Sequence, residues 1–297
     1  MKATAWMLRL FTYKNDSGLR KKRKPIFENL AFRHKFDVNY AGDNLDRHCF
    51  DIYYANEENR KHKLIVDIHG GAYIMSHRKD NLHFGLSFLE QGYDFVTLDY
   101  RVNRGHLTIA DQTGDLAQAI RYIQKHSQEL DIYEDEIYLT GDSAGGHLAL
   151  LFAILSENQG LQEELDLNIA QFKPKAVLVN CPVFDYCGAS LRHTGTRGAQ
   201  KLIYGPRYLD FDFLNRYSPS SYINDLTLPV FCSTCKLDFI RQESLALQKA
   251  LSERGDFEFI DIDSDDPKIG HVHNILLPER EESIRVNNAM MAFIEKY

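Results

Sequence analysis

A serine flanked by glycines is the feature of this chain best suited to covalent chemistry. The segment GDSAG at 141–145 fits the pattern G-x-S-x-G, with Ser143 at its centre. A short strand-like run at 136–140 precedes it and a strongly apolar stretch at 147–155 follows it, which is the strand–turn–helix context that this pattern requires. On such a turn the hydroxyl projects above the sheet, and the helix N-terminus favours developing negative charge. Ser143 is therefore the candidate nucleophile, and the alternative is an ordinary β-to-α turn with a capping serine.

A second glycine turn lies upstream of the serine. His69-Gly70-Gly71 closes the apolar run 64–68. Turns of this type donate backbone N–H groups to the oxyanion of a tetrahedral intermediate. The expected oxyanion hole consists of the amides of Gly70, Gly71 and Ala144, and losing one such donor typically costs about 3–4 kcal/mol. His69 is expected to be a structural residue of the loop rather than a base.

A nucleophilic serine needs a base, and the base needs an acid that orients it. Downstream of such a serine turn, the acid is expected first and the histidine last. Asp238 lies a few residues past the strand-like run 229–232, although it could also be a solvated loop carboxylate or a helix N-cap. The only histidines beyond it are His271 and His273. Both are candidates for the base at this point.

These residues need a scaffold, and the chain alternates strand-like and helix-like segments. Strands are expected at 64–68, 94–100, 136–140, 175–180, 229–232 and 257–262, and helices at 111–126, 147–155, 241–253 and 278–297. This order predicts an α/β domain spanning 1–297, with a mostly parallel central sheet flanked by helices on both faces. Segments 1–35 and 184–225 do not fit the alternation, so they are expected to form a small cap or lid over the site.

Taken together, the motifs resemble those of the α/β-hydrolase branch that contains the hormone-sensitive lipases and small bacterial carboxylesterases. The resemblance covers roughly residues 45–297 and rests on His69-Gly70-Gly71, Gly141–Gly146, Asp99-Tyr100-Arg101 and Leu237-Asp238. It implies the α/β-hydrolase fold, with an aspartate and a histidine completing a triad. In that family the base is usually followed by a small residue and then an aromatic one, which implies His271 as the base. Residues 102–106 lack the Pro and Glu common there, so local substrate contacts do not transfer.

The expected activity is hydrolysis of short-chain carboxylic esters through an acyl-enzyme intermediate. An arylformamidase or other amidase, or a sugar-ester deacetylase, is the alternative on the same fold. A non-catalytic ligand-binding protein of hydrolase fold is the alternative of another class. No cofactor is expected. No metal is expected either, because the twelve histidines show no H-E-x-x-H spacing and the pair Cys232 and Cys235 has no second pair.

Charge and composition limit the partners. The formal net charge is −7, which disfavours nucleic acid and anionic membranes. The basic run 20–24 is expected to be a solvated face. No stretch is apolar enough to span a membrane, and the first ten residues make a poor signal peptide. Five scattered cysteines indicate free thiols in a reducing compartment. The expected protein is therefore cytoplasmic, acts on a small-molecule ester, and is compatible with a homodimer.

Overall fold

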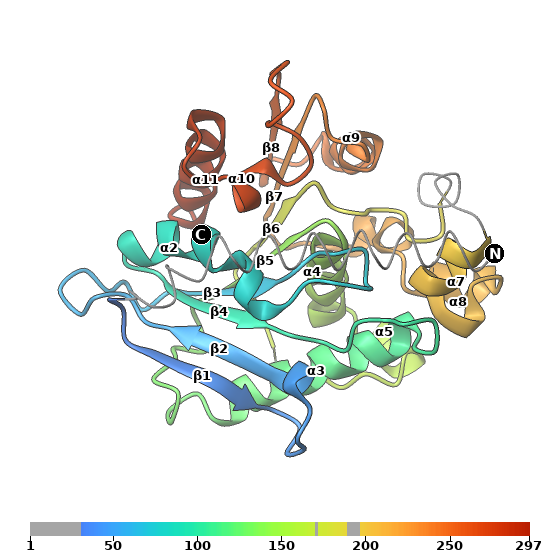
Figure 1. Ribbon diagram of the computed structural model, residues 1–297, viewed down its shortest axis with the longest axis horizontal. Coiled ribbons are helices and arrows are strands. Elements are labelled where there is room, and N and C mark those ends of the chain that lie inside the picture. Colours follow the sequence, from blue (N-terminus) through green and yellow to red (C-terminus); the bar gives the residue numbers. More distant parts are fainter. Residues whose placement is uncertain (1–30, 170–171, 189–196) are drawn as a thin grey trace.

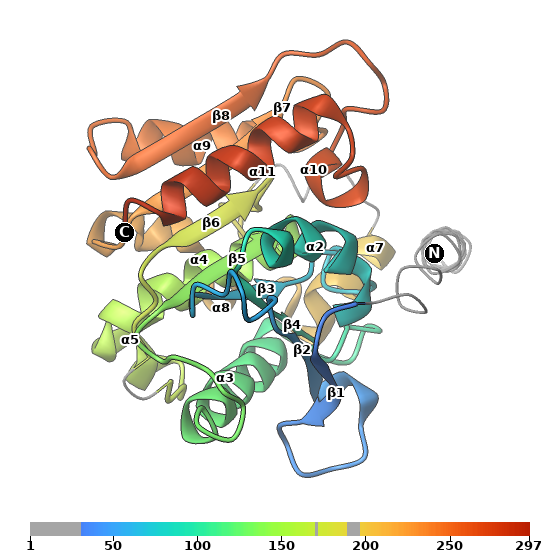
Figure 2. The ribbon, with the colours of Figure 1, turned by 90° about the vertical axis from the view of Figure 1, so that its left-hand side faces the viewer.

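The computed structural model describes residues 31–169, 172–188 and 197–297, and an eight-stranded sheet runs through them (Figure 1). The strand order is β1-β2-β4-β3-β5-β6-β7-β8. The strands are β1 His34–Asn39, β2 Cys49–Tyr53, β3 Leu64–Ile68, β4 Asp94–Leu98, β5 Ile137–Asp142, β6 Val177–Asn180, β7 Val230–Cys235 and β8 Phe257–Ile262. In Figure 2 they stack from β1 at the bottom of the sheet to β8 at the top.

The sheet is parallel from β4 to β8 and antiparallel at one edge. β3 pairs in parallel with β4 and β5, and β5 to β8 continue in the same sense. β2 runs antiparallel to both β1 and β4. The mostly parallel sheet confirms the expected α/β-hydrolase fold. The two antiparallel strands were not expected, because β1 is largely exposed and lacks the continuous apolar run of a central strand.

Helices cover both faces of the sheet, as expected. The described helices are α2 Leu82–Glu90, α3 Ile109–Lys125, α4 Ala144–Glu157, α5 Gln159–Glu164, α7 Arg197–Tyr204, α8 Phe211–Arg216, α9 Arg241–Leu251, α10 His273–Leu276 and α11 Glu281–Ile294. One apolar core joins the sheet to α3, α4 and α9. A second core joins the opposite face to α2 and α11, which lie in front of the sheet in Figure 2. Two cores on opposite faces explain why the inner strands β3 to β7 are buried along their whole length.

Helix α4 is the central support of the serine turn. Twelve consecutive residues, from Ala144 to Leu155, are buried, and all of them except His147 are apolar or glycine, as is typical of a core helix. Its outer side is covered by the segment between β6 and β7. There, His147 Nε2 lies 2.7 Å from the carbonyl oxygen of Tyr217.

The part of the expected cap segment that the structure describes, 184–188 and 197–225, is mostly helical. It contains α7, α8 and 3₁₀ turns. Asn103, in the loop after β4, donates to the carbonyl of Ile203 at 3.1 Å, which ties α7 to that loop. Of the other expected cap, 1–35, residues 1–30 and the basic run within them lie outside the described residues, and β1 begins at His34. Within the described residues, no helix is long and apolar enough to cross a membrane.

Candidate active site

Ser143 occupies a strained turn between β5 and α4. Its φ of 55° and ψ of −116° lie in a region that non-glycine residues rarely adopt. The turn is held from below, because the Ser143 N–H donates to the Asn180 carbonyl at 2.9 Å. Gly145 has no room for a side chain, since an added Cβ would lie 1.9 Å from the carbonyl oxygen of Ile68. The glycine lets the first turn of α4 press against the end of β3, which lifts the serine above the sheet.

Asp238 and His271 form a hydrogen-bonded pair at the carboxyl end of β7. His271 Nδ1 lies 2.7 Å from Asp238 Oδ1. The carboxylate also accepts from the backbone N–H of Ile240 at 3.0 Å and from the Thr234 hydroxyl at 2.9 Å. Burial alone would raise the pKa of Asp238, but the bond with His271 and these donors hold it below its usual value. An ionised, oriented carboxylate favours the His271 tautomer that carries its proton on Nδ1.

His273 lies in a different environment, although it is only two residues away. It is the first residue of α10, its side chain is buried, and its Nδ1 lies 2.9 Å from the hydroxyl of Ser283 on α11. Burial lowers the pKa of His273 to about 4. The geometry therefore brings His271, and not His273, to Asp238.

The two halves of the candidate site meet at the end of β6. Cys181 directly follows the residue that receives the Ser143 N–H, and its Sγ accepts the N–H of Val272 at 3.3 Å. The loop that carries His271 is thereby fixed to the strand beside the serine turn. In the ranges that the structure describes, the Ser143 hydroxyl itself forms no hydrogen bond. Such bonds are often long in ligand-free enzymes and tighten when the substrate binds.

The turn after β3 differs in one respect from expectation. The N–H of Gly70, expected to face the oxyanion, donates instead to Asp142 Oδ1 at 2.9 Å. The amides of Gly71 and Ala72 have no acceptor among the described residues. Both residues adopt positive φ, 98° and 52°. The expected oxyanion hole did not include the Ala72 amide, because the glycines alone marked the turn.

Two buried carboxylates fix this turn from below. Asn81 donates to Asp142 Oδ1 at 2.8 Å and to Asp67 Oδ2 at 3.0 Å. Burial, and then the charge of Asp142, raises the pKa of Asp67 well above its usual value. Burial also raises the pKa of Asp142. Two carboxyl groups this close favour a state in which only one is ionised, and Asp142 is the one that receives the Gly70 amide.

His69 is buried and serves the loop, as its sequence position suggested. It stacks on Tyr100 with ring centroids 4.5 Å apart, and its Nε2 lies 3.1 Å from Asp99 Oδ1. Asp99 also pairs with Arg78 at 2.6 Å and with Arg47 at 3.0 Å. These charges link the loop to the antiparallel edge of the sheet.

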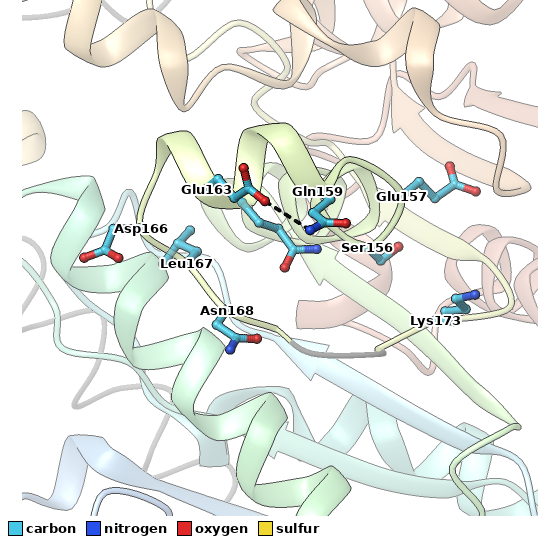
Figure 3. Close-up of a pocket in the computed structure, with 9 residues that line it drawn as sticks. Ser156, Glu157, Gln159, Glu163, Asp166, Leu167, Asn168 and Lys173 are labelled. Atoms are coloured by element: carbon cyan, nitrogen blue, oxygen red, sulfur yellow. Dashed lines mark hydrogen bonds between the residues drawn. The ribbon is translucent and has the colours of Figure 1, made fainter.

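A polar hollow of about 680 Å³ lies at the opposite end of α4 from Ser143. Figure 3 shows its lining of charged and amide side chains around α5, with Gln159 bonded to Glu163. The fourteen residues of α4 span about 20 Å. The hollow is therefore separate from the candidate site at Ser143.

Known proteins provide independent evidence on this chain. A probable isoprenylcysteine alpha-carbonyl methylesterase of Arabidopsis thaliana is 31% identical over 113 residues, which is 37% of this chain and 26% of that protein. An acetylxylan esterase of Xylanibacter ruminicola is 30% identical over 103 residues, or 33% of this chain and 20% of that protein. The chain thus matches about a quarter or less of the length of these curated relatives.

The fold recurs along nearly the whole chain in a solved structure. Esterase B from Lactobacillus rhamnosis (HN001) superimposes with a TM-score of 0.82 at 22% identity, covering 99% of this chain and 96% of that one. At this identity the likeness establishes the fold. Family membership rests on a separate match, because the BD-FAE family model covers residues 50–251, more than half of the 297 residues. The chain belongs to the BD-FAE family.

Proposed function

We propose that the protein is a serine hydrolase that cleaves carboxylic esters of small molecules through an acyl-enzyme intermediate. The observation that carries the proposal is the bond between Asp238 and His271, held beside the strained turn of Ser143. The nucleophile Ser143, the orienting acid Asp238 and the base His271 follow one another along the chain in the order that this chemistry requires. Each of them lies beyond the carboxyl end of a strand.

The reaction begins when Ser143 attacks the ester carbonyl. His271 takes the hydroxyl proton on Nε2, and the Asp238 carboxylate stabilises the imidazolium that forms. The amides of Gly71 and Ala144, with Ala72 beside them, receive the oxyanion, while Gly70 holds the loop through Asp142. His271 then protonates the leaving alcohol. In the second half, water attacks the acyl-enzyme with His271 again as base and releases the acid.

Ester cleavage is favoured over amide cleavage by the curated relatives, since the names of both describe esterases. We propose short acyl chains, a cytoplasmic location and no nucleic-acid partner, as the acidic chain suggests. The segment 184–225 is proposed as a cap because its described part packs on α4 and on the loop after β4. The acetylxylan esterase favours a sugar-ester deacetylase as the second candidate.

The test compares wild type with Ser143→Ala on p-nitrophenyl acetate and butyrate, an acetylated xylooligosaccharide and a formanilide. We expect ester hydrolysis in wild type and at least about a 10⁴-fold lower kcat in the variant, since the nucleophile is gone. A fluorophosphonate probe should label wild type only. Full activity of Ser143→Ala would exclude this nucleophile, and the substrate panel separates esterase, deacetylase and amidase. Absent labelling together with absent hydrolysis would favour a ligand-binding protein.

A further inference from the structure

One cysteine lies inside the cluster that positions the candidate base. Cys181, Asp238 and His271 each offer a ligand atom, and the three atoms lie within 4.8 Å of one another. Sulfur, carboxylate oxygen and imidazole nitrogen are the donors that Zn²⁺ prefers. The hydrolysis proposed above uses the carboxylate and the imidazole but has no step for the thiol.

We propose that Cys181, Asp238 and His271 form an inhibitory binding site for a thiophilic divalent cation such as Zn²⁺. This inference rests on the proposed function for its inhibitory effect, but not for the binding itself. It departs from the sequence expectation of no metal, because three residues far apart in the chain meet only in the fold.

The three ligand atoms lie within 4.8 Å of one another, so small side-chain shifts must bring them to tetrahedral separations. With Zn–S near 2.3 Å and Zn–N or Zn–O near 2.0 Å, ligand atoms are separated by roughly 3.3–3.6 Å. His271 Nδ1 and Asp238 Oδ1 are 2.7 Å apart, so they must separate by less than about 1 Å. A water molecule would complete the coordination from the partly exposed side of His271.

Hydrogen bonds already orient the ligands from behind. The Val272 N–H points at Cys181 Sγ at 3.3 Å, and such a bond stabilises a thiolate. Thr234 and the Ile240 N–H hold the Asp238 carboxylate. Outer contacts of this kind are typical of metal sites, where their loss costs about 10–100-fold in affinity.

Burial suits the same occupant. Cys181 and Asp238 are buried and His271 is partly exposed, so the ligands lie within the protein while one side stays open to water. A bound divalent ion deprotonates a coordinating thiol. Binding therefore releases the Cys181 thiol proton to solvent.

A cation bound at this site would inhibit hydrolysis because it changes which ring nitrogen of His271 carries the proton. In this proposal the ligand nitrogen is Nδ1, the ring nitrogen that faces Asp238. A cation on Nδ1 leaves the imidazole proton on Nε2, and this nitrogen then has no lone pair to accept the proton of Ser143. The ion also replaces the aspartate as partner of the ring. A single binding event thus disables the base without blocking the nucleophile.

The direct test uses Co²⁺ as a spectroscopic probe on the full-length, reduced protein, with a metal-free phosphine as reductant. We expect one ion per chain and a thiolate-to-cobalt charge-transfer absorption in the near ultraviolet. Cys181→Ala and Cys181→Ser should lose this absorption, and Cys187→Ser, which removes a more exposed thiol in 184–188, should keep it. Absence of the absorption in wild type, or its persistence in both Cys181 variants, would overturn the site. Circular dichroism checks that each variant is folded.

The second test measures Zn²⁺ inhibition of p-nitrophenyl butyrate hydrolysis, with each variant compared with its own metal-free rate. We expect inhibition of wild type and of Cys187→Ser, reversed by EDTA, and an inhibition constant at least about tenfold weaker in Cys181→Ala. Equal inhibition of Cys181→Ala would overturn the proposal. The two proposals fail separately: cobalt–thiolate absorption in a protein without esterase activity removes only the proposed function, and esterase activity without that absorption removes only the metal site.

Discussion

At the residue scale, two histidines with similar sequence positions lie in opposite environments. His271 is partly exposed and faces a carboxylate, while His273 is buried against Ser283 of α11. A general base must exchange protons with bound substrate near neutral pH. Burial lowers the pKa of His273 to about 4, so its environment suits packing rather than proton transfer.

Substituting each histidine separately tests the assignment of His271 as the base. His271→Ala should lower kcat by about 10⁴-fold or more on a short ester, because the base is lost. His273→Asn should change kcat by less than about threefold but should lower the free energy of unfolding, since a buried bond is altered. Steady-state kinetics and urea unfolding measure both. The reverse pattern, with activity lost at position 273, would contradict the assignment.

The order of the sequence motifs and the family resemblance predicted the pair Asp238 and His271, which the structure brings together, but not the direction of every backbone group. Gly70 illustrates the limit, because its amide is taken by the side chain of Asp142, a residue 72 positions away. No pattern within five residues can report such a contact. Cys181 is a similar case, since its place beside Asp238 and His271 depends on how three strands end together.

At the element scale, the sharpest constraint is the contact between the end of β3 and the first turn of α4. It requires Gly145, whose added Cβ would lie 1.9 Å from a backbone oxygen. The parallel strands were predictable from short segments rich in apolar and β-branched residues. The antiparallel strands β1 and β2 were not, because β1 is exposed and gains its order from pairing with β2.

A pair of glycine substitutions measures this contact. Gly145→Ala should destabilise the fold by about 1–3 kcal/mol and lower kcat, because α4 must move away from β3 and carry Ser143 with it. Gly114→Ala is the matched control, since that glycine lies in α3 with open space at its Cβ position. The control should raise stability by about 0.5–1 kcal/mol and leave kcat unchanged. Similar stability and kcat for the two variants would show that the contact between β3 and α4 determines neither the stability of the fold nor the position of Ser143.

At the scale of the whole molecule, folding buries two histidines, His147 and His273, in their neutral form. Burial lowers the pKa of His147 to about 4, although its bond to the Tyr217 carbonyl opposes the shift. The pKa of His273 is lowered to about 4 as well. The unfolded chain titrates near 6.5, so the unfolded state binds more protons than the folded state between these values.

Acid should therefore weaken the fold within a defined range of pH. The contribution of both histidines is complete above pH 6.5 and is lost as the pH falls towards 4, on the order of 3 kcal/mol for each group. Urea unfolding from pH 7 to 4 should show a falling free energy of unfolding, with a shallower slope in His147→Gln and in His273→Asn. His106→Gln, at an exposed position, should keep the wild-type slope. If all three variants keep that slope, other groups cause the acid sensitivity, and the buried histidines do not couple folding to pH.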